Sequence, residues 1–352
     1  MFSLPGFTML SSSNAVRLGI DLGAHSLKLV QLQVLNNKIK ILDAELLPLP
    51  AKENGVPASK SASKIHFLKP TIKEWKASKR LRTPSVYVAM ESTSTQWKEI
   101  KLPRLPEEEL KKGIQWQAEK HLTLPVKDCL VDFQILERSG GEETGEMTVI
   151  FVAALKEDIK SLALSLKGAG LNPQRIDVGP FAFAKAVSKI YAKDKTVAAL
   201  DIGAAGTFIS IISGEKMHFL RHIDIGGNKF TQTIAKRTDK SEEEAEQLKI
   251  SSDPAQKEQI KSAINYNLTD LVQTIDQSVL YFKQKFPQHK IDKMILSGSS
   301  VTPLGLREAL AKQIDLDIEI ANVLAQVDVD SSLKHKAADL GPLLMTAVGA
   351  AL

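Results

Sequence analysis

The predicted fold follows first from the segment VRLGIDLGAHSLKLVQLQV, residues 16–34. It opens with an apolar strand that ends in Asp21-Leu22-Gly23, a carboxylate followed by a glycine turn, and it continues as a second strand. A third strand, KIKILDAELL at residues 38–47, follows the turn at Asn36-Asn37. Apolar runs separated by short turns are typical of an antiparallel meander, so the chain is expected to begin with one.

The second half of the chain repeats this pattern. VAALDIG, at residues 197–203, is again an apolar strand that ends in Asp-x-Gly. Further strands and glycine-containing turns follow it: 207–213, 216–223, Gly226-Gly227, 293–297 and Gly298-Ser299-Ser300. Helices are predicted over residues 242–249, with a capping box of Ser241 and Glu244, and over residues 303–314. A long helix is predicted from near Pro254, with one apolar stripe formed by Ile260, Ile264, Leu268, Leu271, Ile275, Val279 and Phe282. The repeat predicts an α/β protein of two similar halves, residues 1–196 and 197–352.

A smaller unit is predicted inside the first half, at about residues 84–178. Its order is strand, helix, two strands, helix, strand, and its two central strands flank the turn Gly140-Gly141. This order predicts a small α+β subdomain inserted into the first half.

Composition excludes several classes of protein. The 352 residues include 46 Lys and Arg against 41 Asp and Glu, and a net charge of +5 is too small to indicate nucleic-acid binding. Cys129 is the only cysteine, which excludes an intramolecular disulfide or a Cys-based zinc cluster and favours the reducing cytoplasm. The apolar N-terminal segment, residues 1–13, has no basic start, so it is not expected to be a signal peptide. No membrane span is expected, because the most apolar run, 196–213, contains Asp201 and a turn.

The strand-end turns point to a site for anions. Backbone N–H groups of such turns can bind phosphate, and a carboxylate beside them can hold Mg²⁺ through water. Lys28, on the second strand, could reach back to phosphates at the Asp21 turn. An exposed strand lysine is the alternative interpretation.

These segments together resemble the actin-like ATPase superfamily. GIDLGAHSLKLVQL, AALDIGAAGTFISI, the pair Gly226-Gly227 and ILSGSS stand where that superfamily has its two phosphate motifs and its adenosine motif. Within it, nearly the whole chain is similar to the PilM family of type IV pilus assembly proteins. The similar segments are IKLPRLPEEELKKGIQWQAEKHLTLPV, GAGLNPQRIDVGPFAFAKA, IGGNKFTQTIAKR, ILSGSSVTPLGLREAL and GPLLMTAVGAAL. The resemblance implies an actin-like (ribonuclease H-like) duplicated fold with a nucleotide cleft between the halves.

The resemblance also implies a site for ATP or ADP with Mg²⁺. It assigns Asp21, Gly23 and Ser26 to the first phosphate loop and Lys28 to the β- or γ-phosphate. It assigns the following residues of the second half: Asp201, Gly203 and Thr207 to the second phosphate loop, Gly226 and Gly227 to close approach of the backbone, Gly298 and Ser299 to the adenosine, and Glu246 and Lys249 to the base. Asp21 and Asp201 are expected to hold Mg²⁺ through water.

Three departures from the superfamily pattern affect the expected activity. Ser299 replaces the second glycine of the adenosine motif, Ala204 stands where actins have another acid, and Ala24-His25 replaces residues that often carry hydroxyls. No residue is identified that would orient an attacking water. The sequence therefore predicts nucleotide binding with at most slow ATPase activity, and the catalytic residues stay unknown.

Trp116 is a candidate for partner contact. On the helix predicted over residues 106–122, the apolar stripe is formed by Leu110, Ile114, Ala118 and Leu122, and Trp116 lies well off it. An exposed tryptophan is typical of a binding surface. The alternative is that this second face packs against the parent domain.

The function that the resemblance implies is that of an ATP-binding scaffold of the type IV pilus machine, and hence of twitching motility. The scaffold would lie in the cytoplasm at the inner face of the inner membrane, with only indirect membrane contact. Its expected partners are the short N-terminal cytoplasmic peptide of a PilN-like membrane protein and the pilus motor ATPases. The alternatives are an FtsA-like filament-forming division protein, a type II secretion platform component, and a sugar or acetate kinase.

Overall fold

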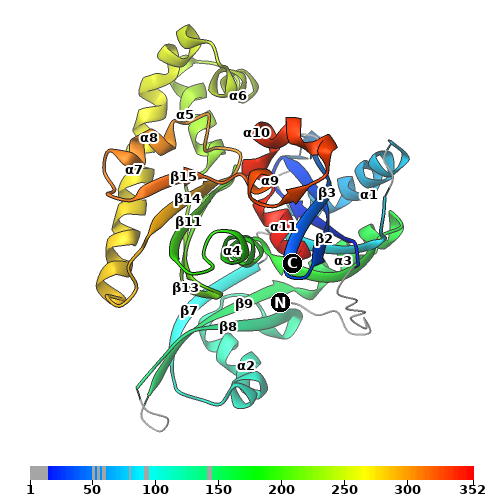
Figure 1. Ribbon diagram of the computed structural model, residues 1–352, viewed down its shortest axis with the longest axis vertical. Helices are drawn as coiled ribbons and strands as arrows, with labels where there is room; N and C mark the ends of the chain where they lie inside the picture. Colours follow the sequence, from blue (N-terminus) through cyan, green and yellow to red (C-terminus); the bar gives the residue numbers. More distant parts are fainter. Residues whose placement is uncertain are drawn as a thin grey trace. The chain divides into compact units, whose positions relative to one another are not determined.

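The computed structural model describes residues 15–49, 52–53, 56–57, 61–78, 81–90, 95–140 and 145–352, and it forms two compact units (Figure 1). Unit 1 comprises Met1–Ala182, Val327–Leu333 and Thr346–Leu352, and unit 2 comprises Phe183–Gln326 and Lys334–Met345. The apolar N-terminal segment, residues 1–13, and Gly141 of the predicted turn lie outside the described residues. The boundaries expected at 84, 178 and 196 stay predictions.

Unit 1 is built on a six-stranded sheet in the order β10-β6-β1-β2-β3-β16. Its strands are β1 (Arg17–Leu22), β2 (Ser26–Leu35), β3 (Lys38–Pro48), β6 (Ser85–Met90), β10 (Asn172–Val178) and β16 (Asp328–Val329). The first three form the predicted antiparallel meander, while β6 lies parallel to β1 and β10 parallel to β6.

Unit 2 repeats this topology in a five-stranded sheet of order β13-β12-β11-β14-β15. Its strands are β11 (Thr196–Ile202), β12 (Thr207–Ser213), β13 (Lys216–Ile223), β14 (Lys293–Ser297) and β15 (Asp317–Ile320). A meander again comes first, and two parallel strands extend the sheet from its first strand. β1 and β11 therefore occupy equivalent places, and the duplication predicted from the sequence is present in the strand order.

The inserted part of unit 1 is a three-stranded sheet, β7-β9-β8, covered by one helix. Its elements are β7 (Thr95–Pro103), α2 (Glu107–His121), η1 (Val126–Asp128), β8 (Cys129–Ser139) and β9 (Glu146–Leu155). Leu110 of α2 is buried in one cluster with Leu102, Val149 and Phe151 of the sheet. This small core positions α2 and with it Trp116.

Helices complete both units. They are α1 (Ser61–Ser78), α3 (Lys156–Gly168), α4 (Gly179–Ile190), α5 (Gly227–Thr238), α6 (Glu242–Ile250), α7 (Pro254–Lys285), α8 (Leu306–Ala311), α9 (Val323–Gln326), α10 (Ala337–Leu340) and α11 (Met345–Ala351). The short pieces are β4 (Lys52–Glu53), β5 (Val56–Pro57), η2 (Ser331–Lys336) and η3 (Gly341–Leu343). Within the described residues, none of the helices combines the length and apolar character of a transmembrane span.

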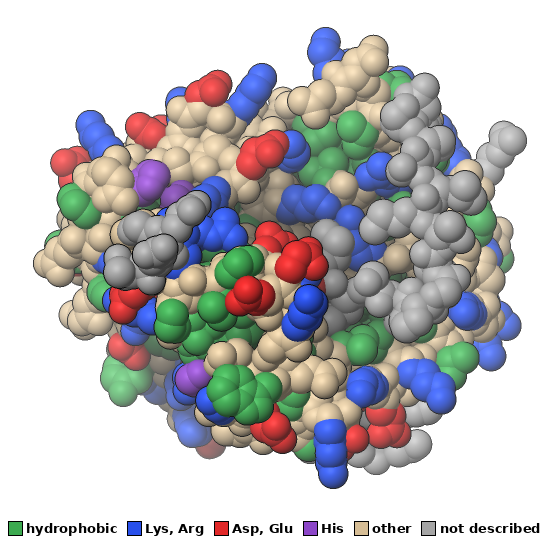
Figure 2. All heavy atoms as spheres, turned by 90° about the horizontal axis from the view of Figure 1, so that it is seen from below, with side chains coloured by type: hydrophobic (Ala, Val, Ile, Leu, Met, Phe, Trp, Pro, Cys, Tyr) green, Lys and Arg blue, Asp and Glu red, His purple; other side chains and the backbone are tan. Residues whose placement is uncertain are grey.

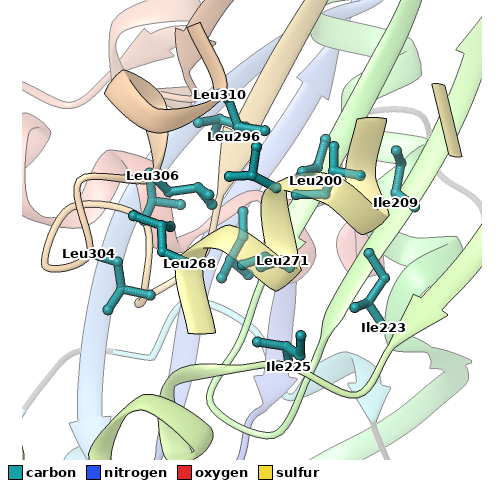
Figure 3. Packing of buried hydrophobic residues seen from close by; sticks show 14 of the residues in the cluster. Leu200, Ile209, Ile223, Ile225, Leu268, Leu271, Leu296, Leu304, Leu306 and Leu310 are labelled. Carbon is teal, nitrogen blue, oxygen red and sulfur yellow. The ribbon is translucent and has the colours of Figure 1, made fainter. Parts of the chain in front are cut away.

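The core of unit 2 confirms the long apolar stripe predicted on α7. Leu268 and Leu271 of this helix pack into one cluster with Leu200 of β11 and Leu296 of β14 (Figure 3). All seven stripe residues are buried: Ile260, Ile264, Leu268, Leu271, Ile275, Val279 and Phe282. Burial of leucine and isoleucine side chains at this helical spacing contributes about 1.5–3 kcal/mol each, so α7 holds the sheet that carries the second predicted phosphate loop.

The helix predicted over residues 303–314 is shorter in the structure. α8 begins at Leu306, because Gly305 has a left-handed backbone (φ 62°) that ends the preceding series of turns. The capping box predicted for α6 is present, since the Ser241 hydroxyl accepts from the Glu244 amide and the Glu244 carboxylate accepts from the Ser241 amide.

Candidate functional site

The two predicted phosphate loops have the same turn. After β1, the Gly23 amide donates to the Ser26 carbonyl at 3.1 Å, and after β11 the Gly203 amide donates to the Gly206 carbonyl at 3.0 Å. Each turn thus follows an Asp-x-Gly strand end and is closed by one backbone hydrogen bond. The internal repeat extends from the sheet order down to the geometry of these turns.

The first loop holds a lysine and a carboxylate together. Lys28 on β2 is in register with Asp21 on β1, and its Nζ lies 3.0 Å from the Asp21 Oδ2. The two side chains are only 14% and 15% exposed. A Cβ added to Gly23 would lie 2.6 Å from the Lys28 Nζ. The Lys28 ammonium therefore lies over the turn, and the alternative of an exposed strand lysine is wrong.

The second loop lacks an equivalent cation on its neighbouring strand. Asp201 of β11 is in register with Phe208 on β12 and with Ser297 on β14. Phe208 thus stands where unit 1 has Lys28. Thr207, which is fully buried, donates its hydroxyl to the Ile225 carbonyl at 2.7 Å. The Thr207 side chain therefore fixes the segment that leads into α5.

The glycine pair packs the start of α5 directly on the second loop. The Gly227 amide donates to the Gly203 carbonyl at 2.9 Å, and the Asn228 amide donates to the Ala204 carbonyl at 2.8 Å. A Cβ on Gly226 would lie 2.5 Å from the Gly206 nitrogen. Only glycine permits this approach of two backbones. Contact of Gly226 and Gly227 with a nucleotide stays a prediction.

The turn after β14 joins the same loop from another side. Gly298 has a left-handed backbone (φ 105°), and a Cβ there would collide with the Ile202 carbonyl oxygen. Ser300 is buried, and its hydroxyl donates to the Gly203 carbonyl at 3.2 Å, whereas Ser299 is exposed. Ser300 is thus a loop contact that the sequence interpretation missed. The run of three serines around Gly298 was its only signal.

A buried lysine supports the first turn of α5. Lys249 is 4% exposed, and its Nζ donates to the Gly227 carbonyl at 3.1 Å and to the Thr231 hydroxyl at 2.9 Å. It also lies 2.6 Å from the Glu246 Oε2, which accepts from Thr231 as well. The pair predicted to flank the base is therefore one network with Thr231, a residue that the sequence interpretation missed.

Lys257 is a second lysine that the sequence interpretation missed. Its Nζ donates to the Lys249 carbonyl at 2.7 Å and to the Pro303 carbonyl at 3.0 Å. Burial, and then the charge of Lys249, lowers the pKa of Lys257. Lys257 joins the end of α6 to the segment that follows the Gly298 turn.

Two sets of predicted site residues are therefore assembled, each within its own unit. The set of unit 1 is Asp21, Gly23, Ser26 and Lys28, and the linked contacts of unit 2 include Gly203, Thr207, Gly226, Gly227, Glu246, Lys249 and Gly298. Asp201 lies two residues before Gly203 on β11. That the two sets bind one ligand stays a prediction.

The residues fit a nucleotide with Mg²⁺. Glycines keep side chains out of both turns, a cation lies over the first turn, and each strand end carries a carboxylate. Backbone turns and carboxylates of this kind suit phosphate and hydrated Mg²⁺. Among the described residues, no group of three or more His, Cys, Asp or Glu side chains could hold a metal ion.

Trp116 lies on the exposed face of α2. Its side chain is 58% exposed, and the Lys120 Nζ lies 3.2 Å from the centroid of its ring. A cation over an indole is a favourable arrangement, and it leaves most of the ring in solvent. This exposure favours partner contact over packing against the parent domain.

Comparisons with known proteins agree with the resemblance. The profile of a family described as "Type IV pilus assembly protein PilM" matches residues 19–352. A chain of the PilM-PilN type IV pilus biogenesis complex is 27% identical, with a TM-score of 0.79 over 96% of this chain and 98% of that chain. The ethanolamine utilization protein EutJ from Carboxydothermus hydrogenoformans is 15% identical, with a TM-score of 0.55 over 98% of this chain and 92% of that chain. The similarity to EutJ concerns the fold alone.

Proposed function

Since the chain belongs to the PilM family of type IV pilus assembly proteins and has the duplicated actin-like fold, we propose that it is an ATP-binding scaffold of the pilus assembly complex. It binds the N-terminal cytoplasmic peptide of a PilN-like membrane protein and lies at the inner face of the inner membrane. The observation that carries this proposal is the 27% identity to a chain of a PilM-PilN complex over 96% of this chain. Contact with the pilus motor ATPases is part of the proposal.

Nucleotide binding uses the turns described above. ATP with Mg²⁺ supplies a triphosphate whose charge the backbone amides and Lys28 neutralise. Asp21 and Asp201 would hold Mg²⁺ through its water ligands. Lys249 and Lys257 act as positioning residues, because they hold the backbone of Gly227, of the end of α6 and of the segment after β14.

Nucleotide binding is coupled to the peptide. A ligand that orders the loops of one state shifts the population toward that state, and by linkage the peptide changes ATP affinity by the same factor. The chain therefore acts as a scaffold whose hold on its membrane partner depends on ATP.

Trp116 provides the test of the partner surface. Trp116→Ala should reduce the amount of a full-length PilN-like protein retained from detergent extract by about tenfold, as expected for a tryptophan in an interface. Tyr266→Ala is the matched control, since Tyr266 is also an exposed aromatic residue on a helix, with Arg237 over its ring. Equal retention of the PilN-like protein by both variants and by the unchanged chain would show that Trp116 is not part of the partner-binding surface. No retention by the unchanged chain would contradict the proposed partner.

A further inference from the structure

Helices α1 and α3 carry a surface that the proposed function does not use. They pack side by side in unit 1, where the Ser165 hydroxyl donates to the Ile65 carbonyl at 2.9 Å. The apolar residues of α1 face inward, because Leu68, Ile72 and Trp75 are buried. Lys69 and Lys73 of α1 are exposed. The helix is therefore amphipathic, with lysines on its outer face.

The charge of this region is strongly one-sided. Residues 61–82 contain seven Lys or Arg and one acid, Glu74, in a chain whose overall excess is only +5. On α3, Lys156, Lys160 and Lys167 are exposed against Glu157 and the half-buried Asp158. Figure 2 shows Lys and Arg side chains at its right-hand edge and also elsewhere around the face that it draws. We call the outer faces of these two helices the lysine surface, defined by Lys69, Lys73, Lys76, Lys160, Leu164 and Lys167.

A structural role accounts for only part of this charge. Lys76 donates to the carbonyls of Ala169 and Gly170 at 3.0 and 3.2 Å, so it caps the C-terminus of α3. A cation is favourable at that end of a helix dipole. One lysine suffices for this cap. The further lysines on the same side repel one another. Because an anionic partner would relieve this repulsion, their accumulation indicates such a partner.

The side chains on the lysine surface select the kind of partner. Leu164 is 58% exposed and lies four residues after Lys160 and three before Lys167, on the same helical face. Protein interfaces are depleted in lysine and gain most of their affinity from Trp, Tyr and Arg. Of the two aromatic residues Phe67 and Trp75 of α1, Phe67 is half-buried and Trp75 is buried. Lysines around one exposed aliphatic side chain suit a fluid anionic bilayer, where each ammonium meets a headgroup and the leucine meets the acyl boundary.

We propose that the lysine surface binds anionic phospholipid headgroups directly. The contact adds an electrostatic attachment to the one through the PilN-like partner, and it does not require that partner. Because the attraction comes from several exposed charges, it is weak, reversible and sensitive to salt.

Vesicle flotation of the full chain tests this proposal. The probes are vesicles of phosphatidylcholine alone and vesicles with about one-third phosphatidylglycerol. The chain should float with the anionic vesicles and not with the neutral ones, and about 0.5 M salt should abolish flotation. The triple variant Lys69→Gln, Lys73→Gln, Lys160→Gln should partition into anionic vesicles at least about tenfold less.

A second triple variant controls for total charge. Lys236→Gln, Lys283→Gln, Lys312→Gln removes three exposed lysines of unit 2 and should float as the unchanged chain does. Equal loss in both triples, or flotation that ignores lipid charge, would overturn the proposal. A third outcome is that the unchanged chain does not bind vesicles, while the first triple variant no longer binds the PilN-like protein. In that case the lysine surface binds an acidic protein segment, and the lipid proposal is wrong.

Discussion

Lys28 and Lys249 lie beside the two predicted phosphate turns, and their surroundings differ. Lys28 lies over the Gly23 turn beside the Asp21 carboxylate, with part of its surface in solvent. Lys249 is buried and donates to a carbonyl, a hydroxyl and a carboxylate. A phosphate could therefore recruit the Lys28 ammonium, whereas Lys249 fixes the backbone.

Lys28→Met should weaken ATP binding by about tenfold or more, since a charge-assisted bond to phosphate is lost. Isothermal titration with Mg-ATP measures the affinity. Lys38→Met is the control, because Lys38 is an exposed lysine at the far end of the same hairpin. An unchanged affinity in Lys28→Met would show that this cation does not contact the nucleotide.

His218 gives unit 2 a defined dependence on pH. It is 7% exposed, its ring centroid lies 4.3 Å from that of His289, and its Nδ1 has no hydrogen-bond partner within the described residues. Burial, then the charges of His289 and Lys216, lowers the pKa of His218 to about 4. The unfolded state titrates near pH 6.5, so the stabilisation is complete above that pH and is lost as the pH falls from 6.5 to 4.

His218→Phe should remove this loss. At pH 5 the histidine lowers the free energy of unfolding by about 2 kcal/mol relative to neutral pH. Urea titrations at pH 7 and pH 5 should show a smaller difference for His218→Phe than for the unchanged chain. His335→Gln is the control, because His335 is an exposed histidine of the same unit. An equal pH dependence in His218→Phe and the unchanged chain would refute the assignment.

At the scale of elements, α11 completes unit 1 by close contact of small residues. Ala350 packs with Ala89 and Ala182, and a Cβ on Gly19 of β1 would collide with the Ala347 carbonyl oxygen. The Arg17 guanidinium donates to the Ala351 carbonyl at 3.0 Å, at the end where the helix dipole favours a cation. Backbone contact and charge therefore hold this helix on the sheet.

Gly19→Ala should lower the free energy of unfolding by about 1–3 kcal/mol, the usual cost of overpacking. Gly113→Ala is the matched control, because a Cβ on Gly113 in α2 meets nothing within 4 Å. That variant should be neutral or up to about 1 kcal/mol more stable. Equal urea midpoints for the two variants would contradict the close contact of α11 with β1.

Local patterns predicted most of these elements. The meander at the N-terminus, the α7 stripe and the capping box of α6 follow from periodicity and from the residues at strand and helix ends, and all are present. The contacts of Ser300, Thr231 and Lys257 could not be predicted, because they join segments far apart in the sequence. The burial of Lys249 could not be predicted either, because it depends on where α6 packs.

At the scale of the whole molecule, the strand order is the strongest structural evidence that the fold is duplicated. The two sheets have the same order of antiparallel and parallel strand pairs, and both halves of the chain contain the Asp-x-Gly strand end. Both halves therefore end a strand in the same kind of turn, which we propose binds phosphate. In the proposed function, these turns would bind the nucleotide, and the PilN-like partner would respond to it.

Calorimetric titration of the full chain with the N-terminal cytoplasmic peptide of a PilN-like protein tests whether the chain is a nucleotide-dependent scaffold. One peptide should bind per chain, with an affinity that changes when Mg-ATP is present. Trp116→Ala should weaken this binding. Absence of binding at peptide concentrations up to about 1 mM, with and without Mg-ATP, would refute the proposed scaffold.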